Sequence, residues 1–335
     1  MTTYQKTNKF KAIQTEEIGK GFISKVVERE FDGLPEGDLL IKVNYSSLNY
    51  KDALSATGNL GVTKKFPHTP GIDAVGIVES SNRSDFKAGT NVIVTGYDLG
   101  MNTSGGFSEY IKIPAEWAIK LPDGLTYRDS MILGTAGLTA GLCVQALEKA
   151  SNIEGKKAVV TGATGGVGCI AVQLLAQLGA EVTAITGKDG TLGFLTGLGA
   201  AEVLQRDQFK ESTRRQQPLS KGLWDLAVDV AGGDLLTSIL ASMKYSGVVT
   251  CCGLVGGTAF ETSIFPFILR GISLIGIDSV EISLDKKVEI WNRFSTDWKL
   301  DNLEGICREV DLVEMLAEID SILEGGQIGR VILKP

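Results

Sequence analysis

A glycine-rich turn between an apolar stretch and a helical pattern carries the clearest chemical signal in the sequence. Residues 159–168 read VVTGATGGVG, with Gly162, Gly165, Gly166 and Gly168 after two valines, and the segment CIAVQLLAQLG that follows has apolar residues at helical spacing. A strand, a glycine turn and a helix in this order direct backbone N–H groups and the positive end of the helix toward a pyrophosphate. The segment predicts a dinucleotide site; the alternative is a turn that only lets strand and helix pack.

The end of the next predicted strand indicates which dinucleotide would bind. A site for NAD usually has Asp or Glu there, which binds the 2′-hydroxyl of the ribose. In this chain EVTAIT ends in Thr186, followed by Gly187 and Lys188. A hydroxyl, a bare amide and a cation suit a 2′-phosphate, so we expect NADPH as the cofactor. NADH stays open as the alternative, because Asp189 comes next.

Length and composition restrict the class of protein. A chain of 335 residues is expected to form two domains, and 43% hydrophobic with 22% charged residues is typical of a soluble globular protein. The net charge of −7 argues against nucleic acid or an anionic membrane as a partner. No signal peptide or apolar run of 18 residues is seen, and the five cysteines form no CxxC pair. A cytoplasmic protein with free thiols is expected.

The pattern of predicted elements changes near residue 130. Before it, short strands separated by turns indicate a compact, barrel-like β domain. After it, a helical segment leads into strands that alternate with helices, which predicts a doubly wound parallel sheet and an α/β fold class. Beyond about residue 280, helices and the final strand VILK are expected to fold back onto the first domain, with the active site in the cleft between the two.

Two other oxidoreductase classes do not fit the sequence. The glycine run also matches TGxxxGxG of short-chain dehydrogenases, which need a Tyr with a Lys four residues later; no tyrosine in the chain has one. A catalytic zinc needs Cys and His ligands, whereas the single histidine, His68, is interpreted as a turn residue and the cysteines form no cluster. No metal is expected.

The order of β domain, glycine-turn domain and returning tail resembles the medium-chain dehydrogenase/reductase superfamily. SSLNYKD (46–52) stands where zinc-containing members have their first cysteine ligand, and PGIDAVGIV (70–78) resembles their GHE segment with the ligands replaced. LNYKDALSATG, GTAGLTAGLCVQALE and FPFILRGISLIGIDSV resemble the zinc-free acrylyl-CoA reductase branch, whose members are often described as quinone oxidoreductases. This implies a GroES-like β-barrel domain at 1–130 and 270–335, and a Rossmann NADPH-binding domain at 131–269.

The resemblance also implies which residues form the site. Those expected to contact the cofactor are Tyr50, Thr164, Gly165, Gly166, Val167, Thr186, Lys188, Arg206, Leu254 and Ser279. Those expected to take part in catalysis are Tyr50, Asn49 and Asp52. Each has a plainer alternative: Tyr50 as a core tyrosine, Arg206 as a solvated surface residue, Leu254 as packing, and Asn49 with Asp52 as the wall of the cleft.

The implied reaction is transfer of hydride from NADPH to the β-carbon of an α,β-unsaturated acyl thioester, with Tyr50 as the candidate donor to the enolate oxygen. Two alternatives remain: a quinone or alkenal reductase, and an NADPH-binding protein with a structural or sensing role. Candidate cations for the phosphates of an enoyl-CoA substrate are Lys64, Lys65 and Arg270. The apolar strand at 271–279 predicts an exposed sheet edge and a homodimer; a monomer with a covered edge is the alternative.

Overall fold

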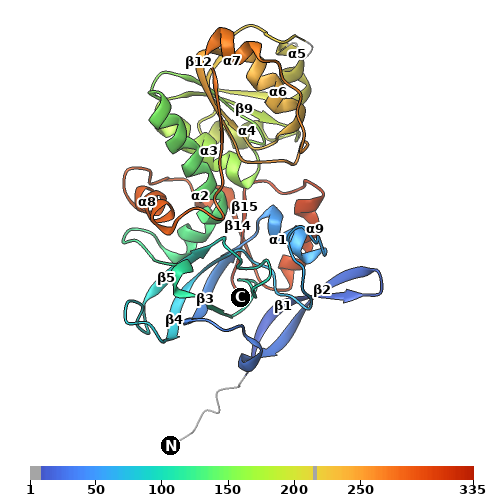
Figure 1. The fold of residues 1–335 in the computed structure, drawn as a ribbon, viewed down its shortest axis with the longest axis vertical. Helices are drawn as coiled ribbons and strands as arrows, with labels where there is room; N and C mark the ends of the chain where they lie inside the picture. Colours follow the sequence, from blue (N-terminus) through green and yellow to red (C-terminus); the bar gives the residue numbers. More distant parts are fainter. Residues whose placement is uncertain (1–8, 214–216) are drawn as a thin grey trace, which may run out of the picture. The chain divides into compact units, whose positions relative to one another are not determined.

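The computed structural model describes residues 9–213 and 217–335, which form two compact units (Figure 1). The first unit contains the chain up to Thr135, then Val280–Lys299 and Leu303–Pro335, and the second contains Ala136–Ser279 and Leu300–Asn302. The second unit therefore runs to Ser279, past the expected boundary at residue 270. The reason is that strand β13 (Ser273–Gly276) pairs with β12 (Met243–Cys251) of that unit.

The first unit is built mainly on antiparallel β-structure, to which the end of the chain adds the parallel pair β14 and β15. A two-stranded hairpin consists of β1 (Lys9–Ile18) and β2 (Gly21–Glu30). A seven-stranded sheet has the order β14-β15-β3-β4-β5-β7, with β6 also paired to β3. Its strands are β3 (Leu39–Ser47), β4 (Asp73–Ser81), β5 (Asn91–Thr95), β6 (Tyr110–Ile113), β7 (Ala118–Lys120), β14 (Cys307–Val310) and β15 (Arg330–Leu333).

Short helices complete this unit. They are α1 (Tyr50–Ala56), α8 (Leu284–Ser295) and α9 (Glu314–Leu323). β15 pairs antiparallel with β3, and helices α1 and α9 share a buried apolar cluster with strands from both ends of the chain. The C-terminal segment thus packs with the β domain: Val331 and Leu333 are fully buried beside Leu48 in that cluster.

The second unit is a six-stranded parallel sheet in the order β10-β9-β8-β11-β12-β13. Its strands are β8 (Lys157–Val160), β9 (Glu181–Thr186), β10 (Glu202–Gln205), β11 (Trp224–Asp229), β12 and β13. In chain order this is 3-2-1-4-5-6, which is the doubly wound arrangement expected from the alternating pattern. The order reverses between β8 and β11, and such a switch point is where dinucleotides bind in folds of this kind.

The helices of the second unit are α3 (Gly166–Gln177), α4 (Leu192–Gly197), α5 (Arg206–Ser212), α6 (Gly233–Ser242) and α7 (Phe265–Arg270). A longer helical segment, α2 (Tyr127–Ala150), precedes them and is interrupted at Gly134, whose φ of 52° and ψ of −153° are not helical. By length and composition α2 is apolar enough to cross a membrane, but 89% of that stretch is buried within the fold. Its apolar composition is accounted for by this burial.

Candidate cofactor and active site

The glycine turn connects β8 to α3 as the sequence predicts. Gly162 has a φ of 59°, a conformation that favours glycine, and Gly165 is the N-cap of α3. A Cβ at Gly168 would lie only 2.2 Å from the carbonyl oxygen of Gly162. Only glycine at this position therefore lets the first turn of α3 pack so closely against the preceding glycine turn. Gly165, Gly166 and Val167 remain partly exposed, which leaves the N-terminal end of α3 accessible to an anion.

A buried hydrogen-bond network joins the ends of β8 and β11 at the switch point. The Thr161 hydroxyl donates to Oδ1 of Asp229 over 2.6 Å, and the N–H of Gly232 donates to Oδ2 over 2.8 Å. Burial raises the pKa of the Asp229 carboxyl. These bonds hold the two loops that border the turn, and Asp229 is a supporting residue that the sequence analysis missed. Its signal was an acidic residue directly after the apolar run Leu226–Val228, at the carboxyl end of β11.

The predicted 2′-phosphate residues lie at the carboxyl end of β9. The hydroxyl oxygen of Thr186 accepts the N–H of Lys188 over 3.0 Å, and Thr186 is buried while Lys188 is half-buried. The Lys188 carbonyl is held by Gln205 Nε2 at 3.3 Å and by the Thr191 hydroxyl at 3.0 Å. Burial lowers the pKa of the Lys188 ammonium. The turn after β9 is therefore held in a defined conformation around this lysine.

Arg206 lies directly against this turn. Strands β9 and β10 are parallel, with Thr186 opposite Gln205, so the residues that follow them are neighbours. A Cβ at Gly187 would lie 2.7 Å from Nη2 of Arg206 and 3.0 Å from its Cζ. The guanidinium thus packs on the bare Cα of Gly187, next in sequence to Lys188. Two cations beside a side-chain-free backbone suit a ribose 2′-phosphate, so the residues present fit NADPH.

The other predicted cofactor contacts also follow strand ends of the parallel sheet. Leu254 comes after β12 and is 56% exposed. Ser279 comes after β13, and its buried hydroxyl accepts a hydrogen bond of 2.7 Å from the hydroxyl of Thr139. Thr164 is buried in the glycine turn after β8. All the predicted contacts of the second unit therefore lie at the carboxyl edge of one sheet, where dinucleotides bind in doubly wound folds.

In the first unit, Tyr50 is the first residue of α1 and is 37% exposed. The start of this helix is fixed by Asp52, whose buried carboxylate accepts the N–H of Asn49 at 2.7 Å, of Ile72 at 2.7 Å and of Gly71 at 3.1 Å. Burial, and then the nearby Asp73 carboxylate, raise the pKa of Asp52 to about 7. The side chain of Asp52 thus links α1 to the loop before β4 and has no exposed surface.

Asp73 forms the centre of a second buried network beside α1. Its Oδ2 accepts Asn49 Nδ2 at 2.7 Å, the Ser47 hydroxyl at 2.6 Å and the N–H of Thr135 at 2.9 Å. Nη1 of the buried Arg330 donates to the carbonyl of Leu48 at 2.9 Å. The sequence analysis did not single out Asp73, although the PGIDAVGIV segment that contains it was noted. Asn49 is therefore held in place by hydrogen bonds and is only partly exposed.

His68 is not the turn residue that the sequence suggested. It is buried, and its backbone pairs with Thr15 of β1 through hydrogen bonds of 2.7 and 2.9 Å. Burial is the main cause that lowers the pKa of its imidazole. Across residues 9–213 and 217–335, no three His, Cys, Asp or Glu side chains come together in a way that could hold a metal ion.

The candidate cations for a CoA substrate separate into two groups. Arg270 donates to the carbonyls of Ala241 at 3.1 Å and Met243 at 2.6 Å, and also to that of Ser220, so its guanidinium serves to hold α6 and the start of β12. Lys64 and Lys65 instead are exposed in the loop between α1 and β4. Of the three candidates, Arg270 is therefore engaged within the fold, whereas the side chains of Lys64 and Lys65 are exposed.

Comparison with known proteins agrees with this architecture. Residues 35–123 match the model of the alcohol dehydrogenase GroES-like domain, and residues 166–295 match that of the zinc-binding dehydrogenases. The chain is 40% identical over 319 residues to the acrylyl-CoA reductase AcuI of Ruegeria pomeroyi, covering 95% of this chain and 96% of that one. The chain belongs to the medium-chain dehydrogenase/reductase family. The expected combination of a GroES-like domain with a Rossmann domain is thereby confirmed.

Two further relatives show the same fold with a dinucleotide bound. The crystal structure of Escherichia coli YhdH with NADPH is 40% identical and superposes with a TM-score of 0.92, covering 96% of this chain and 99% of that one. YhfP of Bacillus subtilis, named as a quinone oxidoreductase, is 42% identical over 327 residues, 97% of this chain and 98% of its own. Its crystal structure with NAD has a TM-score of 0.94 at 41% identity, covering 98% of this chain and 100% of that one.

Proposed function

We propose that this protein is an NADPH-dependent reductase that transfers hydride to the β-carbon of an α,β-unsaturated acyl thioester of the acrylyl-CoA type. The observation that carries the proposal is the pair of cations at the adjacent ends of β9 and β10, Lys188 and Arg206, beside a glycine turn open at the start of α3. Relatives named as acrylyl-CoA reductase and a structure with NADPH bound support it.

Each part of the cofactor has residues suited to hold it. The N–H groups of Gly166 and Val167 at the start of α3 suit the pyrophosphate, whereas the N–H of Gly165 donates to the Gly162 carbonyl over 2.9 Å. Lys188 with Arg206 suits the 2′-phosphate. When bound, NADPH supplies the hydride. The protein must then orient the thioester and stabilise the negative charge that develops on its oxygen.

Tyr50 is the residue we infer to donate a hydrogen bond to that oxygen. It is exposed at the start of α1, whereas the side chains of Asn49 and Asp52 on either side are engaged in bonds to Asp73 and to backbone N–H groups. We therefore assign Asn49 and Asp52 to positioning Tyr50 rather than to contact with the substrate. A Tyr50→Phe variant should lose roughly 10²–10³-fold in kcat, the effect of removing one oxyanion donor, while the affinity for NADPH is little changed.

The substrate class is tested by following oxidation of NADPH with acrylyl-CoA, with quinones and with small alkenals. We expect acrylyl-CoA to have the highest kcat/KM. A preference for quinones would favour the activity named for YhfP, and the absence of turnover with all three substrates would favour a structural or sensing role.

We further propose a homodimer that forms through β13. This strand lies at the edge of the parallel sheet, and Ile268 and Leu269 on the adjoining helix α7 are exposed. Two copies related by a two-fold axis would pair their β13 edges and cover these side chains. Light scattering should give twice the chain mass of 35.7 kDa. Leu274→Lys should shift the mass toward the monomer, whereas Leu192→Lys on α4 should not.

The location we propose is a reducing compartment such as the cytoplasm. All five cysteines are free thiols, and Cys143 and Cys169 are buried without forming disulfides. Structural disulfides are typical of oxidising compartments and rare in the cytosol. Fractionation of cells that express a tagged protein tests this location directly.

A further inference from the structure

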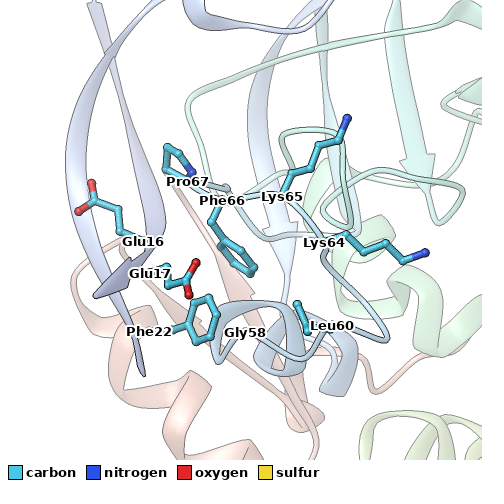
Figure 2. A pocket seen from close by; sticks show the side chains of 9 residues that line it. All are labelled: Glu16, Glu17, Phe22, Gly58, Leu60, Lys64, Lys65, Phe66 and Pro67. Atoms are coloured by element: carbon cyan, nitrogen blue, oxygen red, sulfur yellow. The ribbon is translucent and has the colours of Figure 1, made fainter. Parts of the chain in front are cut away.

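A pocket of about 880 Å³ in the first unit is not used by the cofactor residues described above (Figure 2). It is formed by the ends of β1 and β2 and by the loop between α1 and β4. The residues that line it are Glu16, Glu17, Phe22, Gly58, Leu60, Lys64, Lys65, Phe66 and Pro67. A volume of this size is in the range of pockets that bind small molecules and cofactors.

An aromatic pair forms one wall of the pocket. The rings of Phe22 and Phe66 have centroids 4.6 Å apart and are tilted by 52°. Phe22 is seated on Gly58, which has a φ of 76° and where a Cβ would lie 2.1 Å from the ring. This contact fixes the β1–β2 hairpin against the segment that follows α1, so the wall is a built feature of the fold. Half-buried phenylalanine rings offer a surface on which a planar base can stack.

The charged residues of the pocket are separated by sign. Figure 2 shows Glu16 and Glu17 on one side and Lys64 and Lys65 on the other, with the ring of Phe66 between them and that of Phe22 next to Glu17. Lys64 and Lys65 are both exposed. Glu16 is paired with Lys25 at 2.8 Å, and this hydrogen bond lowers the pKa of Glu16. A ligand that matches the pocket would have an anionic end, an apolar planar centre and a hydrogen-bond donor at its other end.

We propose that this pocket binds the adenosine 3′,5′-bisphosphate portion of coenzyme A. Its phosphates would meet Lys64 and Lys65, its adenine would stack on the aromatic pair, and the exocyclic amino group of the base would donate to Glu17. This inference rests on the proposed thioester substrate. The position of Tyr50 also fits this proposal. Helix α1 leads from Tyr50 to the segment that lines the pocket, a length of roughly 10 Å at 1.5 Å per residue, and a pantetheine arm can span this distance.

The binding test uses the full-length enzyme saturated with NADP⁺, so that the dinucleotide site is closed to the probe. Isothermal titration calorimetry with adenosine 3′,5′-bisphosphate should detect binding, and the double variant Lys64→Ala/Lys65→Ala should weaken it about tenfold. The control Lys87→Ala/Lys299→Ala removes the same charge from exposed positions outside the pocket and should leave the affinity unchanged. Inorganic phosphate should compete poorly. Equal competition by phosphate, or equal affinities of both double variants, would overturn the proposal.

A kinetic test separates this proposal from the proposed function. In the wild type, KM should be lower for acrylyl-CoA than for acrylyl-pantetheine, which lacks the nucleotide. The Lys64→Ala/Lys65→Ala variant should reduce the ratio of KM for acrylyl-pantetheine to KM for acrylyl-CoA about tenfold. If the wild type reduces both thioesters with the same KM, the pocket proposal is wrong and the reductase function stands. If adenosine 3′,5′-bisphosphate binds as expected but neither thioester is reduced, the proposed function is wrong and the pocket stands.

Discussion

The preference for NADPH over NADH should depend on Lys188. This lysine directly follows Gly187, on which the guanidinium of Arg206 packs, and its ammonium is half-buried, with a pKa lowered by that burial. A 2′-phosphate bound at this turn would pair with the ammonium and so compensate for the hydration that the ammonium loses in the folded protein. Because NADH lacks the phosphate, the Lys188→Ala substitution should affect the two cofactors differently.

The size of the effect follows from the partial burial. A hydrogen bond to a charged group contributes about 1.5–3 kcal/mol, whereas an exposed ion pair contributes about 0–1 kcal/mol. Lys188 is intermediate in exposure, so a loss near 1.4 kcal/mol is expected, which is about tenfold in Kd. Arg206→Ala should cost less, because Arg206 is exposed. Gly187→Ala should act in the same direction, since its Cβ would displace a guanidinium that now lies within 2.7 Å.

Fluorescence titration of both cofactors measures the preference. The wild type should bind NADPH at least tenfold more tightly than NADH, and Lys188→Ala should remove most of this difference while NADH binding is unchanged. Lys221→Ala, an exposed lysine of the same unit, is the matched control. If the wild type binds both cofactors with equal affinity, or if Lys188→Ala loses the same affinity for both, the residues at the end of β9 do not bind the 2′-phosphate.

Three other properties follow from the structure. The pKa of Asp52 is raised to about 7, so between pH 4 and 7 the folded protein holds a proton that the unfolded chain has released. The free energy of unfolding should therefore fall by about 2 kcal/mol from pH 5.5 to 8. Asp52→Asn should flatten this dependence in urea titrations, and an unaltered slope would assign it to another group. The fully buried Lys287 donates to the carbonyls of Thr95 at 2.7 Å and Val280 at 2.9 Å, so Lys287→Met should lower the free energy of unfolding by about 1–3 kcal/mol, and a thermal melt like that of the wild type would contradict this. Activity should survive prolonged EDTA treatment. If one zinc per chain were lost together with activity, the interpretation that SSLNYKD (46–52) lacks a zinc ligand would be wrong.

The cofactor half of the site could be predicted because its residues are close together in the sequence. Strand, glycine turn and helix occupy residues 157–177, and the 2′-phosphate residues directly follow the next strand. Arg206 is separated from Lys188 by a helix, yet parallel pairing of β9 with β10 brings the ends of the two strands together. In a parallel sheet the carboxyl ends of neighbouring strands always meet at one edge, so a correct order of strands is enough to group such residues.

The surroundings of Tyr50 could not be predicted in the same way. Asp73 joins Ser47, Asn49 and Thr135, which are 26, 24 and 62 residues away in the chain, and Arg330 reaches Leu48 across 282 residues. Nothing in the local pattern indicates these partners, because they depend on how β3, β4 and β15 are arranged. The same holds for His68, whose position beside β1 is set by a pairing with Thr15.

These two networks explain why the side chains of Asn49 and Asp52 are not available for chemistry, whereas that of Tyr50 is. Buried polar groups must be hydrogen-bonded, and the bonds of Asp52 and Asp73 use the N–H of Asn49 and its side-chain amide. Tyr50 follows Asn49 on the same turn, but its side chain is exposed. Substitution of Asn49 or Asp52 should therefore lower activity by displacing Tyr50, with an accompanying loss of stability, whereas Tyr50→Phe should lower activity alone. This difference separates residues that position the hydroxyl from the residue that supplies it.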